Sequence, residues 1–104
     1  MQTIEEIDVK ELDAKIELNC GSIKIKLCKV PFGFKCNRNI IGENTHGGMV
    51  WQVEDVCPSS DAPFVTIRPF DNEKIIAYNW LGMDYYIDIQ TGKLSFVNKN
   101  RRPW

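Results

Sequence analysis

The sequence predicts a mainly β protein, an antiparallel meander of seven or eight strands that forms an open curved sheet or a partial barrel. Two observations support this fold class. Apolar and polar residues alternate over much of the chain, and a period of two is typical of strands that bury one face. Turn-forming residues interrupt the alternation at short intervals, as they do in antiparallel sheets.

The N-terminal segment, residues 1–13, fits two structures. Thr3 and Glu6 have the spacing of a capping box, which favours a short helix. Ile7 and Val9 alternate with polar residues, which favours a strand instead. Both interpretations stay open at this point, and no longer helix is predicted elsewhere in the chain.

The first half of the chain predicts two hairpins. The first covers residues 15–28 and turns at 20–21, where a glycine follows a cysteine. A loop follows at 29–37, because its proline and glycine break regular structure. The second hairpin covers 39–54 and reverses through the polar, glycine-rich stretch 43–48.

The second half predicts four short strands after an irregular connection at 55–62. Closely spaced turn residues separate these strands, which favours a meander. The strands are expected at residues 64–68, 74–80, 83–89 and 93–97.

A weak internal repeat divides the predicted strands into two sets. Residues 40–51 resemble residues 86–96 if one residue is dropped. Each half then supplies four strands, starting near residues 15, 22, 39 and 49 and again near 63, 73, 83 and 93. Residues 87–94 also look like the outer hairpin of a β-propeller blade, but two blades cannot close a ring.

Length and composition predict one soluble domain, residues 1–104, with a single core. The N-terminus lacks the features of a signal peptide and no apolar run is long enough to span a bilayer, so we expect a cytoplasmic protein that does not bind membranes. In the reducing cytosol the cysteines are expected to be free thiols. They are Cys20, Cys28, Cys36 and Cys57.

The reactive residue types do not form a recognisable catalytic or metal-binding pattern. Structural zinc sites bring ligands in close pairs, whereas the cysteines here are 8, 8 and 21 residues apart. His46 is the single histidine, and it lies in a glycine-rich turn. We therefore expect a protein that is not an enzyme and needs no metal or cofactor; a small enzyme built on His46 with a cysteine or carboxylate remains an alternative.

The net charge of −1 conceals two blocks of opposite sign. Residues 41–92 carry eight acids and two bases, giving −6, whereas residues 21–40 carry five bases and no acid, giving +5. The basic block interleaves with two phenylalanines, as a platform for single-stranded nucleic acid would. A lysine-bearing edge hairpin has the same pattern. The residues are Lys24, Lys26, Lys29, Phe32, Phe34, Lys35 and Arg38.

Three segments, residues 51–54, 77–82 and 87–93, resemble a group of small bacterial β-rich proteins of mostly unassigned function. Some of these are similar to immunity proteins of contact-dependent growth inhibition toxins. The resemblance covers about residues 39–98. It implies a cytoplasmic protein that neutralises a toxin, for instance a nuclease, by covering its active site.

The aromatic residues favour a protein-binding surface. Tyr85 and Tyr86 are neighbours, so on a strand they point to opposite faces, and the second face stays exposed unless a short helix or the C-terminal tail covers it. Acids of the central block would complement the basic cleft of a nuclease toxin. The predicted partner-binding residues are Glu54, Asp55, Asp61, Asp71, Glu73, Trp80, Asp84 and Tyr85, with Trp80 and Tyr85 as anchors. The alternative function is nucleic-acid binding by the basic hairpin 24–38.

Overall fold

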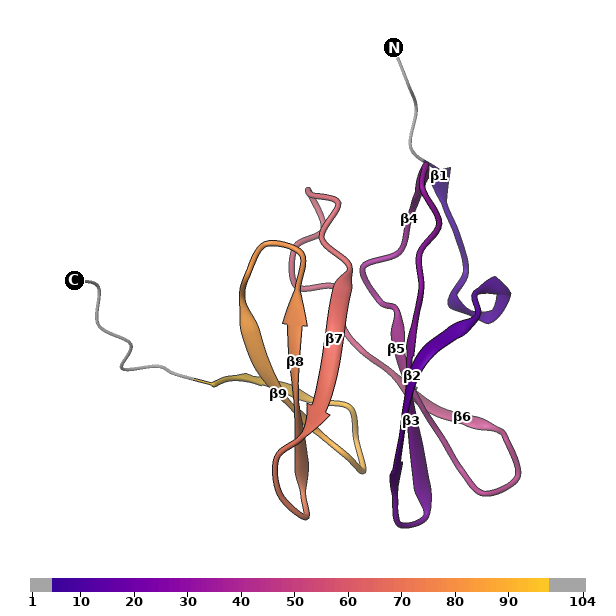
Figure 1. Cartoon of the computed structure of the whole chain (residues 1–104), viewed down its shortest axis with the longest axis vertical. Helices are drawn as coiled ribbons and strands as arrows, with labels where there is room; N and C mark the ends of the chain where they lie inside the picture. The colour runs from indigo at the N-terminus through magenta and orange to yellow at the C-terminus, as the bar shows by residue number, and fades with distance from the viewer. Residues whose placement is uncertain (1–4, 98–104) are drawn as a thin grey trace, which may run out of the picture.

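A computed structural model describes residues 5–97 of the chain. Within this range the fold is mainly β, with two four-stranded antiparallel sheets, one small parallel strand pair and no closed barrel. Figure 1 shows the two sheets side by side, one from each half of the chain. The predicted fold class is therefore confirmed, with the strands divided between two sheets.

Both sheets are antiparallel meanders whose strands lie in chain order. The first sheet has the order β2 (Ala14–Cys20), β3 (Ile23–Cys28), β5 (Ile40–Glu43) and β6 (Met49–Gln52). The second has the order β7 (Phe64–Pro69), β8 (Lys74–Asn79), β9 (Asp84–Asp88) and β10 (Leu94–Phe96). Each of the eight strand starts expected from the repeat lies within one residue of the observed start.

Side-chain alternation decides which face of each strand enters the core. In β3, Ile23, Ile25 and Leu27 are buried against the second sheet's apolar residues, while Lys24 and Lys26 point to the other face. The core contains fully buried Ile25, Leu27 and Ile40 from the first sheet, and Ile75 and Ile87 from the second.

The N-terminal segment covers the outer face of the first sheet. It contains the two-residue strand β1 (Glu5–Glu6), which pairs in parallel with β4 (Phe34–Lys35), and a short 3-10 turn, η1 (Val9–Glu11). Val9 is buried with Cys28 and Ile41 in a second, smaller apolar cluster. Glu6, the second residue of the predicted capping box, lies in strand β1, and the helical alternative is reduced to the three-residue turn η1; Thr3 lies outside the described residues.

Residues 5–97 contain no α-helix. They accordingly provide no helix with the length and apolar character required to cross a membrane.

Trp51 connects the two sheets at the end where β9 finishes. Its indole lies against Gly42 of its own sheet and against Gly92, which follows β9. A Cβ atom at Gly42 would lie 2.4 Å from Trp51 Cε2, and one at Gly92 would lie 2.5 Å from Trp51 Cδ2. The indole N–H donates a 2.8 Å hydrogen bond to the carbonyl oxygen of Ile89. The ring therefore needs two glycines in order to reach the opposite sheet.

We predict that Gly42→Ala destabilises the protein because its methyl group must displace the Trp51 ring. Overpacking of this kind lowers the free energy of unfolding by about 1–3 kcal/mol. Urea denaturation followed by circular dichroism measures the change. The control is Gly48→Ala, whose Cβ atom would come no closer than 3.3 Å to Asn44 in an exposed turn. Equal stability of the two variants would contradict the role assigned to Trp51.

Candidate functional site

A cleft of about 570 Å³ opens between the two sheets at the end opposite Trp51, which is the upper end in Figure 1. One wall is the loop after β3, with Pro31, Phe32 and Phe34. The other wall is formed by the start of β7 and by the turn after β8. Its apolar residues are Pro63, Phe64 and Trp80. The cleft has the size and the mainly apolar lining of a binding site.

Several large apolar side chains around this cleft are exposed. Phe32 is 92% exposed at the tip of the first wall, and Trp80 is 70% exposed on the second. Leu81 and Met83, in the same turn as Trp80, are exposed to 53% and 46%. A group of exposed apolar residues is typical of an interaction surface.

The turn that carries Trp80 is held rigidly by the buried side chain of Asn79. Asn79 Oδ1 accepts hydrogen bonds from the backbone N–H groups of Leu81, at 3.1 Å, and Met83, at 2.9 Å. Gly82 supplies the positive φ angle of 83° that the turn requires. Trp80 and Leu81 are therefore presented on a fixed backbone.

A second turn in the molecule has the same hydrogen-bond pattern and different side chains. Asn44 Oδ1 accepts hydrogen bonds from the N–H groups of His46 and Gly48, both at 2.9 Å, and Gly47 has a φ angle of 83°. This turn holds Thr45 and His46 at the positions of Trp80 and Leu81. The turn geometry therefore does not require apolar residues at its tip.

The amide of Asn39 joins the first sheet to the edge of β7 beside the cleft. Its Nδ2 donates to the carbonyl oxygens of Phe64, at 2.8 Å, and Cys28, at 2.9 Å. Its Oδ1 accepts from the N–H group of Phe64 at 2.9 Å. One buried side chain thus occupies both backbone hydrogen-bonding groups of Phe64.

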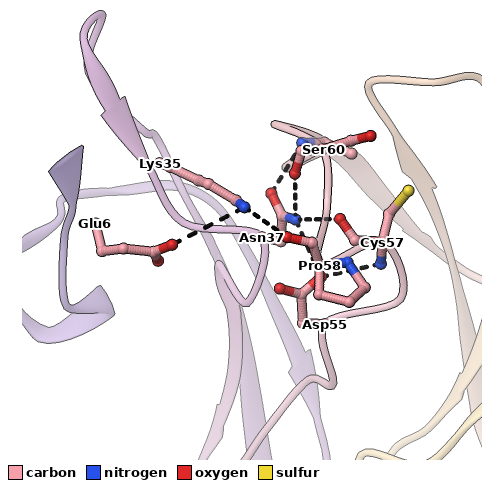
Figure 2. Close-up of polar contacts among 8 residues, drawn as sticks. Glu6, Lys35, Asn37, Asp55, Cys57, Pro58 and Ser60 are labelled. Atoms are coloured by element: carbon pink, nitrogen blue, oxygen red, sulfur yellow. Dashed lines mark hydrogen bonds and ion pairs between the residues drawn. The ribbon is translucent and has the colours of Figure 1, made fainter. Parts of the chain in front are cut away.

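The amide of Asn37 orders the connection between the two sheets, as Figure 2 shows. Its Nδ2 lies within 3.0 Å of acceptors on Asp55, Cys57 and Ser60, and its Oδ1 accepts from the N–H group of Ala62 at 2.8 Å. The ammonium group of Lys35 adds a 2.8 Å hydrogen bond to the carbonyl oxygen of Pro58. Sequence reasoning missed both Asn37 and Asn39, because their hydrogen-bond partners are distant in sequence.

The structure divides the predicted acidic residues between two ends of the molecule. Asp61 lines the cleft together with Trp80, and Asp84 begins β9 directly after the turn of Trp80. Glu54 and Asp55 follow β6. Asp71 and Glu73 precede β8 and lie at its other end. The acidic block is therefore not one surface.

Two of the predicted acids also accept hydrogen bonds that hold the backbone in place. Asp55 Oδ1 accepts hydrogen bonds from Asn37 and from the N–H group of Cys57. Asp71 Oδ1 accepts from the N–H groups of Glu73 and Lys74, both at 2.8 Å, and so shapes the turn between β7 and β8. Glu54 and Asp61 are exposed, and Asp84 is half-buried.

Tyr85 is not a surface anchor, and that prediction is corrected. It is only 7% exposed, with ring centroids 6.0 Å from Phe64 and 5.6 Å from Phe96. It shares its face of β9 with Ile87, which faces the core. Tyr86 points to the outer face, as the alternation requires, and packs against Phe70 at 4.7 Å.

The basic block is largely engaged within the fold. Lys24 pairs with Glu17 at 3.6 Å, Lys26 pairs with Glu43 at 3.1 Å, and Arg38 Nε donates to the carbonyl oxygen of Val53 at 2.8 Å. Lys35 is held by Pro58 and by Glu6. Lys29 and Phe32 are exposed, but Phe34 is half-buried in the cleft wall. Four of the five cationic residues therefore already have a partner within the fold.

The residues considered for catalysis or metal binding lie apart. His46 is exposed at the tip of its turn, and no group of three metal-ligating side chains occurs within residues 5–97. The four cysteines are free; Cys28 and Cys36 are buried, whereas Cys20 and Cys57 are half-buried. Burial raises the pKa of the thiols of Cys28, Cys36 and Cys20 above the ordinary value.

The fold and the cleft define a two-sheet β protein with exposed aromatic side chains at one end. The chain belongs to a family described as a domain of unknown function, DUF7957, whose profile matches residues 3–99. Searches of curated proteins and of solved structures give no significant match.

We predict that Asn39→Asp lowers stability strongly, whereas Asn44→Asp does not. Asn39 donates hydrogen bonds to two buried carbonyl oxygens, and a carboxylate would repel both. The free energy of unfolding should fall by about 3 kcal/mol or more. The side chain of Asn44 accepts both of its hydrogen bonds through Oδ1, so an aspartate there can keep both contacts. Urea denaturation of the two variants provides the test, and similar losses would exclude this role for Asn39.

We predict that iodoacetamide at neutral pH modifies Cys57 before Cys28 and Cys36. Burial limits access to the latter two, and their raised pKa values reduce the reactive thiolate. Peptide mapping by mass spectrometry measures each rate, with the protein in guanidinium chloride as the unfolded control. If Cys28 or Cys36 reacts equally fast in native and unfolded protein, the buried cluster is wrongly described.

Proposed function

We propose that this chain is a protein-binding module that docks a partner through the cleft end of its two sheets. The observation that carries the proposal is the rigid turn at Asn79, which displays Trp80 and Leu81 to solvent. Tryptophan is among the residues most enriched at the energetic centres of interfaces. A fixed backbone also reduces the ordering that binding would otherwise require.

Phe32 provides a second anchor on the opposite wall. Its loop is closed by a 3.1 Å hydrogen bond from the N–H group of Phe34 to the carbonyl oxygen of Pro31, and Gly33 has a φ angle of 91°. Phe32 and Trp80 both line the cleft. A partner that fills the cleft would therefore bury both anchors at once. An interface of standard size, about 800 Å² on each side, fits this end of the molecule.

The partner we propose is a toxin domain, which makes this chain a cytoplasmic immunity protein without catalytic activity or a cofactor of its own. The resemblance of residues 39–98 to small bacterial β-rich proteins, some of them similar to immunity proteins, supports this choice. Exposed Asp61 lines the same cleft as Trp80, so it could meet the basic cleft of a nuclease and speed association. Binding at this end would cover the toxin's active site.

The test replaces Trp80 and Leu81 by the residues that the second turn carries, giving Trp80→Thr with Leu81→His. The turn keeps Asn79 and Gly82, so stability should stay unchanged while partner binding weakens by at least about 30-fold, the loss expected of a hot spot. Tagged wild type and variant are compared in parallel capture from the native cells. Isothermal titration calorimetry then measures each purified partner.

The reciprocal change, Thr45→Trp with His46→Leu, is the control for nonspecific apolar binding. A protein that wild type retains supports the proposal if the Trp80→Thr, Leu81→His variant loses it. Adding the Thr45→Trp and His46→Leu changes to that variant should not restore its capture. If the Trp80 variant retains every partner of wild type, the docking surface is wrong. A captured partner that does not arrest growth when expressed alone, or whose toxicity this chain does not relieve, would exclude the immunity role.

A further inference from the structure

The edge of β7 beside the cleft is closed to a pairing strand. Asn39 occupies both the N–H and the carbonyl group of Phe64, and the ammonium group of Lys15 lies 3.4 Å from the carbonyl oxygen of Val65. The ladder between β7 and β8 also shifts register between Phe64 and Thr66, which disrupts a regular edge. An occupant of the cleft must therefore bind through side chains rather than by extending the sheet.

The walls of the cleft suit a chain that makes no backbone ladder. Aromatic grooves bind proline-rich segments, which are already extended in the polyproline II form and have solvated carbonyl groups. Here the rings of Phe32, Phe34 and Trp80 line the groove. The exposed indole of Trp80 makes no side-chain hydrogen bond within residues 5–97, so its N–H can donate to such a carbonyl.

The two walls carry opposite charges. Lys15 and Lys29 line the first-sheet side of the cleft, and Asp61 lines the second-sheet side. All three are exposed. A segment lying between the walls would be complemented if it carried an acid toward the lysines and a base toward the aspartate. Polyproline II has three residues per turn, so it can present three separate faces.

We propose that the cleft binds an extended, proline-containing segment of the protein partner, with prolines against the aromatic rings and an acidic and a basic side chain on the other two faces. This inference rests on the proposed function and specifies the chemistry of the segment that the docking surface takes. Trp80 and Phe32 pack against the prolines. Lys15 and Lys29 pair with the acidic side chain, and Asp61 pairs with the basic one.

The test titrates the ¹⁵N-labelled full chain with a dodecapeptide of Pro-Glu-Lys repeats and follows the amide and indole signals by NMR. The signals of Phe32 and Trp80 should shift together. A peptide of Gly-Glu-Lys repeats has the same charges without the preformed conformation, and it should bind at least about tenfold more weakly. Trp80→Ala should remove the response, and Asp61→Asn should weaken it.

Absence of shifts at Phe32 and Trp80 would overturn the inference, as would equal binding of the glycine peptide or shifts confined to the outer edges β6 and β10. The two proposals can fail separately. A partner whose capture needs Trp80, together with no response to the proline peptide, refutes only the segment chemistry. A proline peptide that binds, together with no partner lost on changing the turn, refutes the docking of a cellular protein.

Discussion

The contact of Trp51 with two glycines sets how the two sheets meet. No β-ladder joins the sheets within residues 5–97, so side chains must fix their relative position. At the end of β9 the indole of Trp51 fills the space that Gly42 and Gly92 leave open, and it satisfies the carbonyl of Ile89. Because packed interiors do not yield readily, a ring held on both sides in this way resists movement of one sheet against the other. The cleft opens at the other end, where this contact is absent.

At the cleft end, side-chain amides take the place of a ladder. Asn39 forms the paired hydrogen bonds that a neighbouring strand would give Phe64, and Asn37 orders the connection that leads into β7. Each amide is buried, so each unmet bond would carry the full penalty of a desolvated polar group. The same bonds close the β7 edge to other chains. The aromatic cleft therefore lies beside a strand edge that is not open to pairing with another strand.

The sequence predicted the strands well because alternation and turn residues are local signals, and the eight starts follow from them within one residue. Local signals indicate which face of a strand a side chain lies on, but not which distant residues it contacts. Tyr85 and Tyr86 had to lie on opposite faces of their strand. Tyr85 is two residues from Ile87 and so shares its face, which could have assigned Tyr85 to the core. Nothing local linked Asn39 to Phe64, which is 25 residues away. The acidic block also failed as a surface, because β8 separates Asp71 from the turn of Trp80.

The two asparagine turns distinguish what the fold needs from what a partner would need. Their hydrogen bonds and glycine conformations match, so the backbone is equally well formed around Thr45 and His46 and around Trp80 and Leu81. Burying a large apolar side chain is worth about 1.5–3 kcal/mol, and the exposed pair leaves most of that unused in the free protein. A partner that covers the turn would recover it. The proposed docking would therefore give the exposed indole a role that folding does not require.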